Sequence, residues 1–146
     1  MARAGDYSEV QVTGLGTSGG SPHVVLGDGQ GRRLPIAIGP CEMEAIGQRL
    51  DESFDAPRPL AQDLALAGIR ALGAELVMLR IDDFWEGPRE HGTFYGQLIL
   101  RQGDAEVLVD CRPSDGIALA LAAGVMIVVA DSILTELGFN PDVDEE

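Results

Sequence analysis

The feature that most constrains the fold of this chain is an internal repeat at a spacing of 73 residues. Pro40 and Pro113 are separated by this distance, and the same offset runs without a gap through the segment before each proline. The matching residues include Val25 and Leu98, Leu26 and Ile99, Leu34 and Val107, Ile36 and Val109, Glu42 and Asp115, Ala45 and Ala118, and Ile46 and Leu119. Chance similarity between two generic hairpin–helix units is the alternative to a duplication.

A duplication predicts the fold class. Each repeat contains three strand signals followed by a helix signal, so we expect two β-β-β-helix units. One such unit would leave a sheet face uncovered, and the two units are therefore expected to share one core. The sequence predicts a single α+β domain over residues 1–140, with a mostly antiparallel sheet and helices, and a disordered acidic tail over residues 141–146.

Glycine and proline residues set the expected boundaries of the elements. The predicted strands are 7–15, 23–26, 33–38, 74–84, 93–100, 106–111 and 126–129. The predicted helices are 40–50, 59–72, one that begins at Pro113, and one that Asp131 caps. The short strand 126–129 is a candidate sheet edge, at which strands of two chains would pair.

The charge balance limits the partners of the protein. The 146 residues carry a net charge of −14, and all ten positively charged side chains are arginine. We do not expect a broad basic face that holds DNA or an anionic membrane, because such binding depends on many phosphate contacts. A phosphate substrate that is held by metal ions and a few arginines stays open.

The cellular compartment is predicted from the absence of membrane, secretion and disulfide signals in the sequence. The longest apolar run, Ile117–Ala130, has fourteen residues, which is too short to span a bilayer. Residues 1–6 contain no apolar segment of the kind found in secretory signals. Cys41 and Cys111 lack the spacing of zinc ligands and the density of a disulfide scaffold. We expect a cytoplasmic protein with free thiols and no membrane contact.

Three segments combine a proline with acidic side chains near a predicted helix start. A helix N-terminus offers unpaired N–H groups and a positive dipole, and a neighbouring arginine can bind a phosphate through two hydrogen bonds. The alternative is that these residues have a structural role. Acids near a helix start stabilise the helix through its dipole, and they would also pair with these arginines. The segments are 34–44 with Glu42 and Glu44, 58–64 with Arg58 and Asp63, and 109–118 with Arg112, Ser114 and Asp115.

Four parts of the chain carry motifs of a known family. They are Leu34-Pro35-Ile36 with Ile38-Gly39 and Glu42, then Arg58-Pro59 with Asp63-Leu64, then Gly92-Thr93-Phe94-Tyr95, and finally Asp110 with Arg112-Pro113-Ser114-Asp115 and Ile117-Ala118-Leu119-Ala120. In these motifs the chain resembles the bifunctional nuclease domain family over about Tyr7–Leu137. The resemblance implies an α+β domain of a kind that is associated with cleavage of DNA and RNA in some members of the family.

For phosphodiester cleavage, the residues present favour metal-assisted hydrolysis. Mg²⁺ or Mn²⁺ prefers carboxylate oxygens. The candidate catalytic residues and metal ligands are Glu42, Asp63 and Asp115, with Glu44 as a further metal ligand. Glu42 and Glu44 lie about 200° apart around a helix, so Glu42 is ranked above Glu44. The candidate substrate-binding residues are Arg58, Arg112 and Ser114.

The chain departs from the family pattern at positions that bear on catalysis. The family usually has Thr-His before the aspartate of its second motif, where this chain has Ala61-Gln62. Glutamine cannot act as an acid or a base. A non-catalytic module that binds a small anion or a protein partner is therefore kept as the alternative, and an acidic assembly subunit is a third possibility. Assembly into a homo-oligomer is expected.

Overall fold

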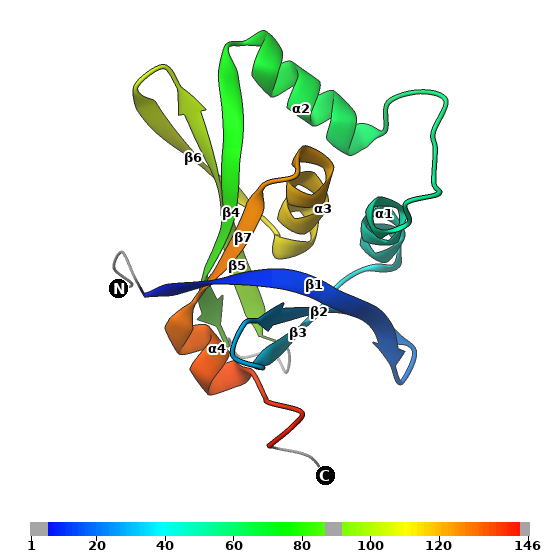
Figure 1. The fold of residues 1–146 in the computed structure, drawn as a ribbon, viewed down its shortest axis with the longest axis vertical. Coiled ribbons are helices and arrows are strands. Elements are labelled where there is room, and N and C mark those ends of the chain that lie inside the picture. The colour runs from blue at the N-terminus through cyan, green and yellow to red at the C-terminus, as the bar shows by residue number, and fades with distance from the viewer. Residues whose placement is uncertain (1–5, 87–91, 144–146) are drawn as a thin grey trace.

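The computed structural model describes residues 6–86 and 92–143. Within these residues, seven strands form one sheet and four helices accompany it (Figure 1). The elements are β1 (Tyr7–Ser18), β2 (Ser21–Asp28), β3 (Arg33–Ala37), α1 (Pro40–Leu50), α2 (Ala61–Ala71), β4 (Ala74–Trp85), β5 (Thr93–Gln102), β6 (Ala105–Cys111), α3 (Pro113–Ala123), β7 (Met126–Ala130) and α4 (Asp131–Leu137). The predicted mostly antiparallel α+β fold is confirmed.

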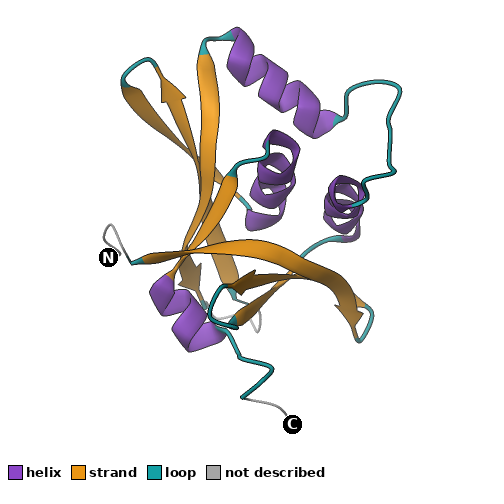
Figure 2. Ribbon diagram, viewed as in Figure 1, coloured by secondary structure: helices purple, strands orange, loops and turns teal. Residues whose placement is uncertain are grey.

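The order of the strands reflects the repeat. The sheet runs β3-β2-β1-β7-β4-β5-β6, and all neighbours are antiparallel except β4 and β7. Each half contains a β-β-β-helix unit, and the helices α1 and α3 both have eleven residues. Figure 2 shows β1–β3 running across the view and β4–β6 running along it, so the sheet twists strongly between the two halves. The duplication is therefore visible in the fold.

Strand β7 joins the two halves, and the prediction that it lies at a sheet edge was wrong. It pairs with β1 on one side and β4 on the other. Four of its five residues are buried, because an apolar strand without alternating polar residues requires cover on both faces. The sequence 126–129 is therefore a central strand and is not available for pairing between chains.

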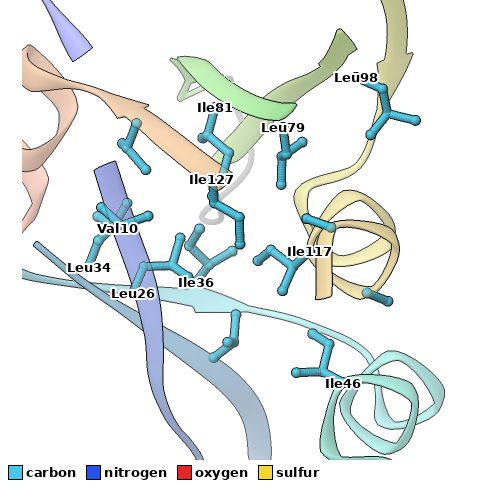
Figure 3. Packing of buried hydrophobic residues seen from close by; sticks show 14 of the residues in the cluster. Val10, Leu26, Leu34, Ile36, Ile46, Leu79, Ile81, Leu98, Ile117 and Ile127 are labelled. Atoms are coloured by element: carbon cyan, nitrogen blue, oxygen red, sulfur yellow. The ribbon is translucent and has the colours of Figure 1, made fainter. Parts of the chain in front are cut away.

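The core lies between the sheet and the helices α1 and α3 (Figure 3). The largest side chains that are completely buried come from both repeats and from the strands between them. They include Leu26, Leu34, Ile46, Leu79, Ile81 and Ile117. Helices α1 and α3 also pack against each other, so the two units share one hydrophobic core. Among the described residues, no helix is long and apolar enough to cross a membrane.

Gly116 allows α3 to pack tightly on β4. A Cβ atom at this position would lie 2.5 Å from Cδ1 of Leu79 and 3.0 Å from Sγ of Cys111. Both neighbours belong to strands beneath the helix, and Leu79 is completely buried. Glycine at position 116 is thus explained by the size of the side chain at position 79.

Gly116→Ala is expected to lower the melting temperature, since overpacking a filled core costs about 1–3 kcal/mol. For a domain of this size the shift would be roughly 3–10 °C, measured by circular dichroism. Adding Leu79→Val should recover much of the loss, because it shortens the colliding side chain. A melting temperature that does not change in Gly116→Ala would contradict the close packing.

Arg32 connects α4 to the turn between β2 and β3. Its Nε donates to Oδ2 of Asp28 at 2.7 Å, and its Nη2 donates to Oδ1 of Asp131 at 2.8 Å. Asp131 also accepts a hydrogen bond from the Ser8 hydroxyl at 2.8 Å. The prediction that Asp131 caps α4 was wrong: α4 starts at this residue, and no side chain caps it. The carboxylate instead belongs to an ion-pair network.

Candidate functional site

A cleft opens where the two repeats place their helix starts together. Strand β3 leads into α1 and strand β6 leads into α3, and α1 and α3 are neighbours. The cavity between these turns has a volume of about 520 Å³. We call it the α1/α3 cleft. It is lined by residues 36–39, Phe84, residues 92–94 and residues 112–114.

Arg112 connects the two helix starts. Its Nη2 donates to Oε2 of Glu42 at 3.1 Å, and its Nε donates to Oδ2 of Asp115 at 2.9 Å. Glu42 lies in the first turn of α1, and Asp115 lies in the first turn of α3. The repeat therefore brings its matched acids to one guanidinium. The Arg112 side chain is 65% exposed, so solvent and ligands can reach it.

Both helix starts have free backbone donors. Prolines occupy the first helical positions, where a missing N–H costs no hydrogen bond. No side-chain hydrogen bond caps either start within the described residues. The backbone N–H groups at the next two positions therefore have no partner within the helix. Ser114 is buried and contributes to the cleft wall. This environment suits an anion.

Gly39 gives the Glu42 side chain room to fold back. A Cβ atom at position 39 would collide with Oε1 of Glu42. The glycine has a φ of −85°, which every residue adopts, so space and not backbone conformation requires it. Glycine here keeps the carboxylate next to Arg112.

Gly39→Ala is expected to displace the Glu42 carboxylate and break its contact with Arg112. The melting temperature should change by no more than about 2 °C, since only the end of a flexible side chain must move. A crystal structure of the variant and a thermal melt measure both effects. Gly47→Ala in the same helix is the control, because its Cβ would lie at an ordinary 3.5 Å from Leu15. An unchanged Glu42–Arg112 contact in Gly39→Ala would contradict this role.

An aromatic wall closes one side of the cleft. The rings of Phe84 and Phe94 lie 4.5 Å apart between centroids and are tilted by 54°. Phe94 also packs against the hydrophobic core, so the wall is held in place from behind. Tyr95 and Trp85 are exposed on the same hairpin. The cleft thus combines anion donors with an apolar surface.

Cys111 does not provide a nucleophile at this site. Burial, and then the negative charges of Asp110 and Asp115, raises the pKa of its thiol to about 11. The reactive form of a cysteine is the thiolate, which is scarce at neutral pH with such a pKa. Cys41 is exposed and Cys111 is half-buried, and both are free thiols.

Asp63 lies in a second cluster at the other end of α1. Nη2 of Arg49 donates to its Oδ2 at 3.0 Å, and the Leu60 N–H donates to the same oxygen at 3.0 Å. These two hydrogen bonds, the first being the stronger cause, lower the pKa of Asp63. Arg49 is seven residues after Glu42, about 10 Å along the helix axis. Asp63 is therefore held away from the α1/α3 cleft.

Arg58 lies on this second cluster as well. Together with Arg49 and Asp63 it lines a separate cavity of about 430 Å³. The helix predicted to start near Pro59 is present, but α2 begins two residues later, at Ala61. The hydrogen bond from the Leu60 N–H to Asp63 fixes this later start. The second motif thus differs from the other two, in which proline is the first residue of the helix.

The structure brings together four of the seven predicted site residues. Glu42, Arg112, Ser114 and Asp115 meet at the α1/α3 cleft. Arg58 and Asp63 form the second cluster, and Glu44 is exposed on α1. Over residues 6–86 and 92–143, no group of three or more His, Cys, Asp or Glu side chains is arranged to hold a metal ion. His91 and the tail residues 144–146 lie outside the described residues.

Three residues that shape the site were not predicted from the sequence. Arg49 belongs to no motif, and only its spacing of seven from Glu42 indicates that both lie on one helix. Gly39 is a motif residue whose spatial reason becomes clear only with the Glu42 side chain in place. Phe84 lines the cleft through its pairing with Phe94 across the hairpin, which requires the strand register.

Comparisons with known proteins identify the family of this chain. The sequence profile of the Bifunctional nuclease domain matches residues 24–142. Two proteins of Mycobacterium tuberculosis are each 39% identical over 142 residues, which cover 94% of this chain and 81% of the relative. They are "Uncharacterized protein MT1877" of strain CDC 1551 / Oshkosh and "Uncharacterized protein Rv1829" of strain ATCC 25618 / H37Rv. With the motifs, the fold and the matched range in agreement, this chain belongs to the bifunctional nuclease domain family.

Proposed function

We propose that this domain hydrolyses phosphodiester bonds of DNA or RNA at the α1/α3 cleft, with help from a divalent cation. The observation that carries the proposal is the Glu42–Arg112–Asp115 cluster at the mouth of the cleft. It combines two carboxylates, one exposed guanidinium and two uncapped helix starts. Membership of the family supports the same reaction class.

Arg112 and the helix starts would bind the scissile phosphate. An exposed guanidinium can exchange its carboxylate partners for a phosphate. Two oxygens of the phosphate can then accept a pair of N–H hydrogen bonds, as the two oxygens of a carboxylate do. The backbone N–H groups at the uncapped starts of α1 and α3 would add further donors. Such donors stabilise the charge that grows on the phosphate during hydrolysis.

Glu42 and Asp115 would hold the cation. Mg²⁺ is commonly bound by one or two carboxylates together with substrate phosphates and water, so this pair of oxygen donors fits it and fits Mn²⁺. When bound, the cation supplies Lewis acidity that activates water and neutralises phosphate charge. In the free protein Arg112 balances the two carboxylates, which keeps them close together until cation and substrate arrive.

The charge of the protein makes cation dependence a sharp test. With a net charge of −14, we expect weak binding to nucleic acid without a divalent cation. Cleavage of end-labelled single-stranded RNA and DNA should occur with Mg²⁺ or Mn²⁺ and should stop with excess EDTA. Strong binding to duplex DNA in EDTA, or cleavage that EDTA does not reduce, would contradict the proposal.

A non-catalytic anion-binding module is the second candidate. Two observations favour it: both carboxylates are already paired with Arg112, and position 62 is glutamine. Under this alternative the cleft binds a nucleotide or another small phosphate without cleavage. Calorimetric titration with a nucleoside monophosphate, performed beside the cleavage assay, separates the two. Binding together with no cleavage under any cation would support the module and reject the nuclease.

A further inference from the structure

The two edges of the sheet are protected very differently. The β3 edge is short, contains Pro35, and is covered by the C-terminal segment through paired backbone hydrogen bonds between Arg33 and Phe139. Proline and a covering segment are both devices that stop another chain from pairing with an edge. At the opposite edge, β6 has seven residues and no proline. No other described strand pairs with its free side.

The free edge of β6 is also apolar on both faces. Residues 105–110 are all exposed. Val107 and Val109 share the face of the core residue Leu98, to which Val109 is directly paired, and they are 38% and 39% exposed. Leu108 points to the other face and is 48% exposed. Three consecutive apolar side chains on an open edge form an incomplete surface.

Acidic residues frame this apolar row. Glu106 and Asp110 lie on either side of Leu108 on the same face, because side chains alternate along a strand. A strand that paired with β6 would place its own residues directly opposite these five. The complementary pattern is basic, apolar, apolar, apolar, basic. It reads the same in both chain directions, so parallel and antiparallel pairing satisfy it equally.

A second copy of this chain does not provide that pattern. The antiparallel register that places Leu108 opposite its own copy also places Glu106 opposite Asp110 twice. Like charges directly opposite each other destabilise a strand pair, and each chain carries a net charge of −14. The charge of the edge therefore favours a cationic partner over self-association.

We infer that β6 is a docking edge for an extended segment of another protein, in which basic residues flank three apolar ones. The backbone of the segment pairs with β6, its apolar side chains cover Val107, Leu108 and Val109, and its basic side chains meet Glu106 and Asp110. Strand addition of this kind takes affinity from main-chain hydrogen bonds and specificity from the alternating side chains. The edge ends directly before Arg112, so the partner would lie beside the α1/α3 cleft.

A labelled peptide tests the inference directly. The probe is a fluorescein-labelled, acetylated heptapeptide Ser-Lys-Val-Leu-Val-Lys-Ser, and the control replaces both lysines with glutamate. Fluorescence anisotropy on the full chain should show at least about tenfold tighter binding of the lysine peptide. Leu108→Lys should abolish this binding, and Glu106→Lys with Asp110→Lys should reverse the preference between the two peptides. Equal binding of both peptides, or binding that these variants leave unchanged, would overturn the inference.

Self-association provides an independent readout. Glu106→Lys would place a basic side chain opposite Asp110 in the twofold register, so this variant is expected to gain an association through β6 in analytical ultracentrifugation that the wild type lacks. A wild-type dimer that Leu108→Lys dissociates would overturn the inference in favour of self-pairing. Leu108→Lys lies outside the α1/α3 cleft and should retain nucleic-acid cleavage, so the docking edge and the proposed nuclease can fail separately. Thermal melts confirm that each variant is folded.

Discussion

Arg112→Ala is expected to reduce phosphodiester cleavage by roughly a hundredfold or more, the usual effect of removing one charge-stabilising donor from an active site. The fold should persist, because the side chain is 65% exposed and its partners Glu42 and Asp115 reach solvent once it is removed. Initial cleavage rates with single-stranded RNA and DNA measure the first effect. A thermal melt of the same sample measures the second.

Two further variants define what Arg112 does. Arg112→Lys keeps the charge but loses the planar pair of donors, so its activity should be intermediate. Arg70→Ala is the matched control, because Arg70 is also exposed and also pairs with a carboxylate, that of Glu75 at 3.6 Å. A melting temperature several degrees lower in Arg112→Ala, with residual activity that only follows the folded fraction, would show that the arginine is a structural anchor of the helix starts.

Arg32→Ala is expected to cause the largest loss of stability. It would leave the Asp28 carboxylate without its counter-ion, and the Asp28 side chain is only 2% exposed. Breaking a buried ion pair on one side costs about 3–5 kcal/mol, and we expect roughly 2–4 kcal/mol here because the Gln30 and Arg32 backbone N–H groups still bind Asp28. The melting temperature should fall by roughly 5–15 °C. Arg70→Ala, which removes a surface ion pair, should change it little.

The same network predicts how this loss depends on pH. Burial alone would raise the pKa of Asp28, but hydrogen bonds from Arg32 and Gln30 outweigh it and lower the pKa. Hydrogen bonds from Arg32 and Ser8 lower the pKa of Asp131. Carboxyl groups with lowered pKa values stabilise the fold above their unfolded pKa, near 4, and lose this contribution as the pH falls through the folded value.

The stability difference between the wild type and Arg32→Ala should therefore be fully present at pH 7 and should shrink below about pH 4. Urea unfolding at several pH values measures it. Adding Asp28→Asn to Arg32→Ala should recover part of the loss at pH 7, since no buried charge then remains unpaired. A difference that stays constant from pH 7 to pH 3 would contradict the proposed role of the ion pair.

The repeat explains how much of the fold was predictable. Helices α1 and α3 begin at Pro40 and Pro113 as expected, because proline fits the first helical position and both are preceded by a strand. The start expected near Pro59 lies two residues later, at Ala61, because the Leu60 N–H donates to the Asp63 carboxylate and so sets the beginning of α2. The place of β7 in the sheet also could not be predicted, since sequence shows that a strand is buried but not which strands flank it.

The candidate site, like the fold, could be predicted from the sequence only in part. Glu42 and Asp115 occupy matching positions in the two repeats, so packing of the repeats brought them together around Arg112. Asp63 lies outside both repeats, between α1 and β4. Its position depends on Arg49 at the far end of α1, a long-range contact that no local pattern reveals. Two of the three candidate catalytic acids therefore lie together beside Arg112, and the third belongs to a separate cluster.

The central claim is that the Glu42–Arg112–Asp115 cluster is the hydrolytic centre, and Asp115→Asn tests it most directly. The substitution keeps the shape of the side chain and removes its charge. Cleavage of single-stranded RNA and DNA with Mg²⁺ or Mn²⁺ should be lost in Asp115→Asn. It should persist in Asp63→Asn, which alters the second cluster in the same way. Equal cleavage by the wild type and a folded Asp115→Asn, or loss only in Asp63→Asn, would contradict this assignment.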